Sequence, residues 1–196
     1  MVRFISFLFL LFFAVDLCAQ KDSAYRYPGM LKGTATITPG FMLNTNQTNI
    51  YINGDLEYFA DDKISIRGDA FWMVGSQQKE ALLQQNSSIF FGALYHVHKN
   101  RFDYFIGLQP GLSITKPNST SMLVSLNANA DYNYKLLPNF SPVTGITFYV
   151  SDYFNFFLNV RYVYARYYGY QSSSLNLDEF RISAGLGFQI HTRKKK

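Results

Sequence analysis

The amino-acid sequence predicts an all-β protein, an eight-stranded antiparallel up-and-down transmembrane β-barrel. Eight segments of about a dozen residues alternate between apolar and polar side chains, which is the pattern of β-strands. A strand that crosses an outer membrane needs about 9–11 residues, whereas strands of globular proteins usually have about 5–6. The connections between the segments also alternate in length, as they do in bacterial barrels.

The eight segments are separated by breaks rich in Asn, Asp, Ser, Gly or Lys, which are residue types of turns and loops. They are Gly33–Leu43, Thr48–Phe59, Lys63–Val74, Ser87–His98, Phe102–Ile114, Pro142–Val150, Phe154–Tyr167 and Glu179–Ile190.

The predicted connections place both chain ends on the periplasmic side of a membrane. Tight turns are expected at Ala60–Asp62, Lys99–Arg101 and Ser151–Tyr153. Longer connections are expected at Gly75–Asn86, Thr115–Ser141 and Tyr168–Asp178, with a short one near Thr45–Gln47. Met122–Lys135 also alternates and is a candidate ninth strand, but a ninth strand would leave the carboxyl terminus outside. We therefore assign this segment to the third external loop, as an extension of its hairpin.

Composition excludes two broad classes of protein. Apolar residues make up 48% of the 196 residues, yet the mean hydropathy is close to zero, so the apolar residues are interleaved rather than gathered into membrane-spanning helices. The 18% aromatic content argues against disorder. The net charge of +5 is carried mostly by the basic tail Arg193–Lys196, so a nucleic-acid partner is not expected.

The amino-terminal residues are typical of a cleaved export signal. Arg3 is followed by the apolar stretch Phe4–Val15 and by the small residue Ala19. Lipid attachment at Cys18 is not expected, because Asp16 and Leu17 stand where small residues are needed. The predicted organisation is a signal peptide at 1–19, a periplasmic segment at 20–32, an outer-membrane barrel at 33–190 and a basic periplasmic tail at 191–196.

The alternation defines two faces for each segment, and a spanning strand turns its apolar face to lipid. In the last segment one face is Phe180, Ile182, Ala184, Leu186, Phe188 and Ile190, and the other is Arg181, Ser183, Gly185, Gly187 and Gln189. In the seventh, Phe156, Leu158, Val160, Tyr162 and Tyr164 oppose Asn155, Asn159 and Arg161. In the second, Ile50, Ile52, Leu56 and Tyr58 oppose Asn53, Asp55 and Glu57.

A soluble secreted β-sandwich is the alternative, because it shows the same alternation with the apolar row buried. The barrel is favoured because Tyr and Trp cluster near segment ends, as in the aromatic girdles of outer-membrane barrels. These residues are Tyr58, Trp72, Tyr95, Tyr149, Tyr153, Tyr162, Tyr164 and Tyr167.

Seven charged residues are expected to face the interior, which in an eight-stranded barrel is only wide enough for side chains. They are Asp55, Glu57, Arg67, Asp69, Asp103, Arg161 and Arg181. Confined charges must pair or hold water. We therefore expect a salt-bridged polar plug, with a narrow gated pore for ions or small solutes as the alternative.

No enzymatic signature is found, and no cofactor or metal is expected. A lipid-modifying esterase of the outer membrane needs His and Ser close together on an external strand end, oriented by a carboxylate. The histidines are His96, His98 and His191, all at predicted periplasmic ends, where we interpret them as ordinary interfacial residues. His96 and His98 share a face, but a third metal ligand is missing because His191 lies four strands away.

The external loops are the expected place for a specific function, because loops on a rigid scaffold often carry recognition. Gln77–Gln85 contains Leu82 and Leu83, an apolar pair that would be exposed unless it packs on the rim or on a partner. The third loop contains Asn118–Ser121. The expected partners are outer-membrane lipid and lipopolysaccharide, with a protein partner through these loops as a further prospect.

The run Ser141–Gly169, SPVTGITFYVSDYFNFFLNVRYVYARYYG, followed by Leu177–Ile190, LDEFRISAGLGFQI, resembles the small outer-membrane β-barrel proteins of Bacteroidetes. The resemblance implies an eight-stranded, porin-like or OmpA-like transmembrane barrel. Since no enzymatic signature is found, we expect an integral protein of the bacterial outer membrane with a non-enzymatic, structural or surface-interaction role, and a lipid-modifying outer-membrane enzyme is an alternative. The chain departs from the family pattern by continuing past Phe188 into Ile190, His191 and the basic tail, instead of ending on the usual terminal aromatic residue.

Overall fold

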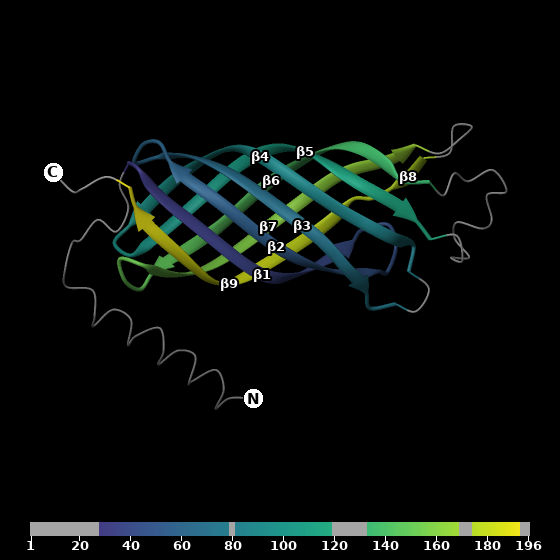
Figure 1. Ribbon diagram of the computed structural model, residues 1–196, viewed down its shortest axis with the longest axis horizontal. Helices are drawn as coiled ribbons and strands as arrows, with labels where there is room; N and C mark the ends of the chain where they lie inside the picture. The colour runs from purple at the N-terminus through teal and green to yellow at the C-terminus, as the bar shows by residue number, and fades with distance from the viewer. Residues whose placement is uncertain (1–27, 79–80, 119–132, 169–173, 193–196) are drawn as a thin grey trace, which may run out of the picture.

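The computed structural model describes residues 28–78, 81–118, 133–168 and 174–192. They form nine antiparallel strands, drawn in Figure 1. The strands are β1 (Met30–Met42), β2 (Thr48–Phe59), β3 (Ile64–Ser76), β4 (Leu83–Lys99), β5 (Phe102–Pro117), β6 (Lys135–Tyr149), β7 (Phe154–Tyr168), β8 (Ser174–Asn176) and β9 (Glu179–His191). None of the described residues forms a helix long and apolar enough to cross a membrane.

Eight of these strands close into a barrel. Each of β1 to β6 pairs with the next strand along the chain, β6 pairs with β7, and β9 pairs with both β7 and β1. Closure pairs the first barrel strand with the last, so that Met30 lies opposite His191. The short β8 pairs only with the end of β7 and stands outside the closed ring. The all-β eight-stranded prediction is confirmed, and the β-sandwich alternative is wrong because a sandwich has no such closure.

The barrel has two different ends, which we call the terminal end and the loop end. Met30 and His191 lie at the terminal end, together with the tight turns that link β2 to β3, β4 to β5 and β6 to β7. Asn100, in the second of these turns, has a φ of 56°, a left-handed conformation that Asn tolerates. The opposite end, at which β1, β3, β5 and β7 end, is the loop end (Figure 1).

Several strand boundaries differ from the sequence prediction, and β4 begins at Leu83 instead of Ser87. β6 begins at Lys135, not at Pro142, because β5 continues to Pro117 and pairs with it, with Thr115 opposite Lys135. Pro138 hid this part of the strand, since proline cannot donate to a ladder. The barrel also begins at Met30, inside the predicted periplasmic segment 20–32. The rest of that segment before residue 28, and most of the candidate ninth strand 122–135, lie outside the described residues.

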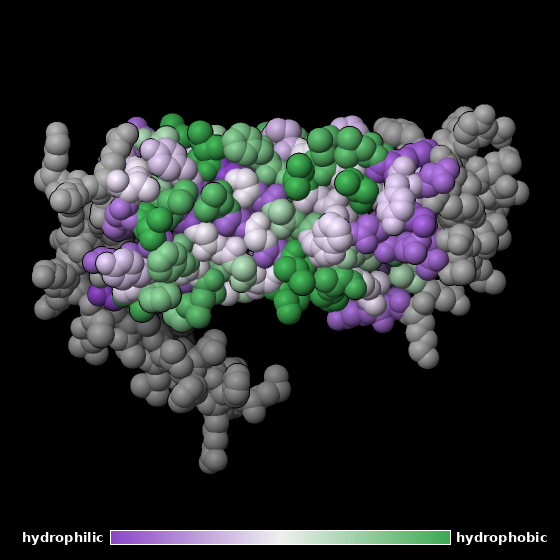
Figure 2. Space-filling view, viewed as in Figure 1, coloured by the Kyte–Doolittle hydropathy of each residue, from purple (hydrophilic) through white to green (hydrophobic). Residues whose placement is uncertain are grey.

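The two faces of the strands separate as the alternation predicted. In β9 the residues from Phe180 to Ile190 at even positions are exposed, and Arg181, Ser183 and Gln189 are buried. The predicted faces of β2 and β7 are confirmed in the same way. The face of the barrel wall seen in Figure 2 therefore carries patches of hydrophobic side chains, while hydrophilic side chains gather at the loop end.

An apolar cluster fills the loop end of the interior. Leu82 and Leu83 are buried there, so this pair packs into the barrel mouth and not on the outside. Its other members are Met42, Tyr51, Phe71, Met73, Phe90, Leu137, Val163, Ala165, Tyr167 and Leu177. This cluster adds an apolar layer to the polar interior that the sequence predicts. The alternation alone did not reveal it, because both faces of the strands are apolar there.

Candidate functional site

The charged interior of the barrel is the candidate functional site. All seven residues that the sequence placed there are buried, at 7% exposure or less. Each projects inward because it occupies an interior position of a strand whose other face is apolar. They form three groups along the barrel axis, which we call the terminal, central and loop-end clusters.

The terminal cluster is built around His96 of β4. Its Nε2 lies 2.9 Å from Oε1 of Glu57, and its Nδ1 lies 2.9 Å from Oδ2 of Asp103. Lys32 of β1 supplies a second cation to the same group, with Nζ 2.7 Å from Oε2 of Glu57. The Tyr149 hydroxyl also donates to Asp103 at 3.3 Å. Glu57 is therefore held between Lys32 and His96, and Asp103 between His96 and Tyr149.

Ser65 completes an arrangement that sequence reasoning did not foresee. Its Oγ lies 2.8 Å from Nε2 of His96, whose Nδ1 faces Asp103, so serine, histidine and carboxylate stand in the order of a hydrolytic triad. However, the Ser65 hydroxyl donates to Oε1 of Glu57 at 2.6 Å. Since that hydroxyl has one proton, its oxygen must accept from Nε2.

Both ring nitrogens of His96 therefore donate, because the carboxylate facing Nδ1 can only accept. An imidazole that carries both protons cannot remove a proton from Ser65. Ser65 is also completely buried, as is Asp103. In this arrangement the three residues bind one another and are not poised for acyl transfer.

The central cluster joins two arginines through shared carboxylates. Nη2 of Arg67 lies 2.8 Å from Asp69 and 3.2 Å from Asp55. Arg161 of β7 lies far from both residues along the chain, and its Nη2 lies 2.8 Å from Oδ2, the other carboxylate oxygen of Asp69. Gln109 bridges the two arginines, since it accepts from Arg161 at 2.7 Å and donates to the backbone oxygen of Arg67 at 3.1 Å.

The loop-end cluster centres on Arg181 and Glu179, two residues apart on β9. Nε of Arg181 lies 2.8 Å from Oε2 of Glu179, and Tyr51 donates to the same oxygen at 2.8 Å. The guanidinium carbon lies 4.1 Å from the Tyr51 ring centroid and 4.7 Å from that of Phe71. Cation–π contacts therefore link this cluster to the apolar cluster above it.

The described interior strands hold five carboxylates, at Asp55, Glu57, Asp69, Asp103 and Glu179, against four permanent cations and His96. With His96 doubly protonated the charges balance. Lys32, His96 and Glu179 are the members that sequence reasoning missed. Glu179 could have been found because it lies two residues before Arg181 on the same strand and so shares its inward face. Lys32 and His96 lie in β1 and β4, where no charged residue had been assigned to the interior.

The interpretation of His96 as an ordinary interfacial residue is wrong. Its side chain is 1% exposed and lies inside the barrel, whereas His98, two residues on, is exposed. The side chain of His98 has passed the end of the interior, because the strand ends at Lys99. Among the described residues, no group of three or more His, Cys, Asp or Glu side chains is placed to hold a metal ion.

Comparisons with known proteins concern the fold. No protein-family model matches the chain, and no curated protein matches its sequence. The N-terminal β-barrel domain of OprF from Pseudomonas aeruginosa is similar in structure, with a TM-score of 0.59 at 12% identity over 84% of this chain and all of that domain.

Two further solved structures are similar. Neisserial surface protein A gives a TM-score of 0.59 at 13% identity, over 81% of this chain and 95% of that one. The outer membrane protein OprG from Pseudomonas aeruginosa gives 0.58 at 11% identity, over 85% and 98%. The chain therefore has the fold of the small eight-stranded barrels of bacterial outer membranes.

Proposed function

We propose that the protein is an integral outer-membrane β-barrel with a non-enzymatic, structural or surface-interaction role and a largely plugged interior. The observation that carries this proposal is the distribution of side chains: large apolar residues face outward around the closed wall, and the charges are buried inside. In water this distribution would leave a large apolar surface exposed around the wall. In lipid the same wall is fully compatible with its surroundings.

Strand length supports the membrane location. The eight barrel strands contain 12 to 17 residues each, enough to cross the hydrocarbon core when tilted. Exposed aromatic side chains lie near strand ends at both ends of the barrel, such as Tyr58 and Tyr95 at the terminal end and Trp72 and Tyr134 toward the loop end. These positions suit the two aromatic girdles of an outer-membrane barrel.

The interior supports a plug in preference to a pore. The paired charges occupy the terminal and central parts of the barrel, and the apolar cluster with Leu82 and Leu83 fills the loop end. An ion that passed through the barrel would have to separate these buried ion pairs. This is costly, because each buried charge is stabilised by its partner. A narrow pore is the alternative outcome, and outer-membrane lipid and lipopolysaccharide are the proposed surroundings.

Membrane fractionation combined with gel mobility tests the location. We expect the protein in the outer-membrane fraction, with an unheated form that migrates differently from the heated one, since a closed barrel resists detergent until it is heated. Recovery as a monodisperse protein in detergent-free buffer would overturn the proposal. Planar-bilayer recordings test the plug, and large stable openings would favour the pore.

The finer assignment to a Bacteroidetes type of barrel rests on the residues of β6, β7 and β9 that resemble that family. The proposed surface role rests on the loop end, where the strands joined by the longer predicted connections begin and end (Figure 1). Deletion of the gene and analysis of lipid A by mass spectrometry tests the non-enzymatic part, because a lipid-modifying enzyme would leave a changed lipid A pattern.

A further inference from the structure

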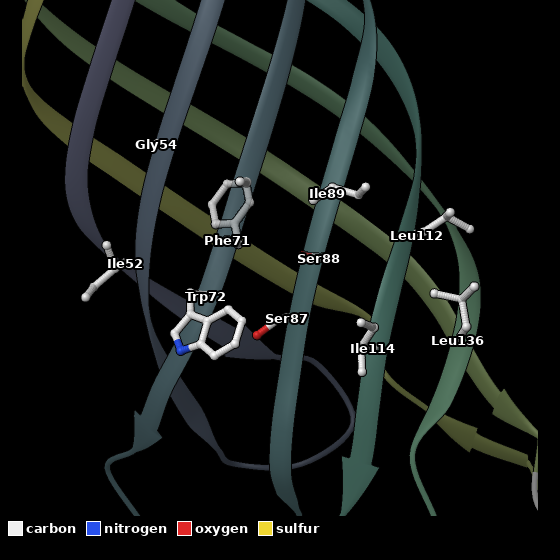
Figure 3. A pocket seen from close by; sticks show the side chains of 11 residues that line it. Ile52, Gly54, Phe71, Trp72, Ser87, Ser88, Ile89, Leu112, Ile114 and Leu136 are labelled. Carbon is white, nitrogen blue, oxygen red and sulfur yellow. The ribbon is translucent and has the colours of Figure 1, made fainter.

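A groove of about 400 Å³ runs along the outer wall of β2 to β6. Figure 3 shows Ile52 and Trp72 on one side of it and Ile89, Ile114 and Leu136 toward the other. These side chains project away from the interior, and their exposed fractions reach 64% at Trp72 and Leu136. The groove therefore belongs to the lipid-facing surface and not to the plugged interior.

Small residues form the floor of this groove. Gly54 of β2 lies opposite Ala70 of β3, which in turn lies opposite Ile89 of β4. Outward positions elsewhere on these strands carry large apolar side chains, such as Leu56 and Ile66. A row of small residues between large ones leaves a depression in the wall that no side chain of the groove fills.

The backbone pairing of β3 with β4 ends at residues that line the groove. Their backbone pairing runs from Ile64 opposite Tyr95 to Phe71 opposite Ser88 and goes no further. Beyond that point the Met73 amide donates to the Ser87 hydroxyl at 3.3 Å, so a side chain takes the place of a ladder bond. The hydroxyl that lies in the groove is therefore hydrogen-bonded, and the groove remains apolar.

A cation stands at the end of the groove that points toward the loops. Lys116 follows Ile114 by two residues on the outward face of β5, and thus lies roughly 7 Å beyond it along the strand. Its neighbour across the ladder in β4 is Gln85. Its Nζ lies 5.0 Å from the centroid of the Tyr134 ring, which is 60% exposed, so the ammonium is held on the outer surface.

We propose that this groove seats an acyl chain of an anionic membrane lipid whose phosphate contacts Lys116. The inference rests on the proposed membrane location. The groove supplies an apolar trough of defined shape, and Lys116 supplies the charge that a phosphate headgroup needs, at the end where the wall meets the loops. A second copy of the chain is the other possible occupant, but the cation favours a partner with negative charge at that depth.

Trp72 provides a direct probe, because it is the one tryptophan in the sequence. The protein, purified from membranes, is reconstituted in phosphatidylcholine vesicles that contain a small fraction of a lipid with brominated acyl chains. Bromine quenches tryptophan fluorescence on contact. At equal fractions, brominated phosphatidylglycerol should show a relative binding constant about fivefold that of brominated phosphatidylcholine, the factor given by about 1 kcal/mol per basic side chain.

Matched variants separate the two parts of the site. Lys116→Gln should reduce the ratio of the binding constants of the two lipids to near one. Lys99→Gln, in β4 at the terminal end of the barrel, should leave this ratio unchanged. Ala70→Phe fills the floor of the groove and should weaken quenching by both lipids. Ala184→Phe places the same bulk on the outward face of β9 and should have no effect. Heat-modifiable mobility confirms that each variant is folded.

Three outcomes would overturn the inference. They are a ratio of one in the unmodified protein, a ratio unaffected by Lys116→Gln, and an absence of quenching accompanied by a cross-linked dimer, which would assign the groove to a second copy. In all three the protein still inserts in the vesicles. Failure to insert would instead contradict the proposed function, so the two failures are distinguishable.

Discussion

Nδ1 of His96 lies 2.9 Å from Oδ2 of Asp103, and both side chains are buried inside the barrel. On the other side of the ring, the hydroxyl of Ser65 donates to Glu57 and leaves its oxygen to accept from Nε2. His96 therefore balances a carboxylate in the terminal cluster, and its ring is the cation that completes the charge balance of the interior.

The first prediction is that both ring nitrogens of His96 carry protons at neutral pH. Nitrogen-15 NMR of protein with labelled histidine should show two protonated nitrogens for the resonance that disappears in His96→Gln. A fluorophosphonate probe should also fail to label Ser65, because the doubly protonated ring cannot activate the hydroxyl. A resonance with one unprotonated nitrogen, or labelling that Ser65→Ala abolishes, would contradict this interpretation.

The second prediction concerns the ion pair between Arg181 and Glu179. Glu179→Gln leaves the Arg181 guanidinium buried without its anion, and should lower the free energy of unfolding by about 3–5 kcal/mol. The double variant with Arg181→Met should lose much less than the sum of the two single changes, since no unpaired charge remains. Denaturant unfolding in vesicles measures Glu179→Gln, Arg181→Met and the double variant, with Asp152→Asn in an exposed turn as the control. Additive losses would mean that the two side chains are not coupled.

The third prediction concerns the barrel mouth. Leu82 is completely buried in the apolar cluster, so Leu82→Ala should reduce the free energy of unfolding by about 2–5 kcal/mol through lost contacts and a new cavity. Gln84→Ala, at an exposed neighbouring position, should change it by no more than about 0.5 kcal/mol. Equal effects of the two substitutions would show that the pair does not pack into the mouth.

The fourth prediction tests the orientation of the wall. Leu158 lies on the outward face of β7 near the middle of the barrel, opposite Ala184 of β9. Leu158→Arg should cost about 2–4 kcal/mol in vesicles, the range for a cation at the membrane midplane, whereas Leu43→Arg at the loop end should cost about 0–1 kcal/mol. The measurement is again the unfolding free energy, and a small cost at Leu158 would mean that this face does not meet hydrocarbon.

The sequence alone determined the number of barrel strands, the two faces of each strand and seven of the charged residues of the interior. These features follow from local alternation, because successive side chains of a strand point to opposite faces whatever the strand pairs with. The even-numbered residues from Phe180 to Ile190 could therefore be separated from Arg181 without knowledge of any neighbour. The Tyr and Trp residues near segment ends then favoured placing the apolar face outside.

The tertiary structure decided which interior residues meet. Arg161 reaches Asp69, and Ser65 and His96 meet between two carboxylates, only because closure and strand register set those positions side by side. The same register extended β6 across Pro138 to Lys135 and drew Leu82 and Leu83 into the mouth. Such contacts join residues far apart along the chain, so their distances depend on the pairing of whole strands and cannot be read from local periodicity.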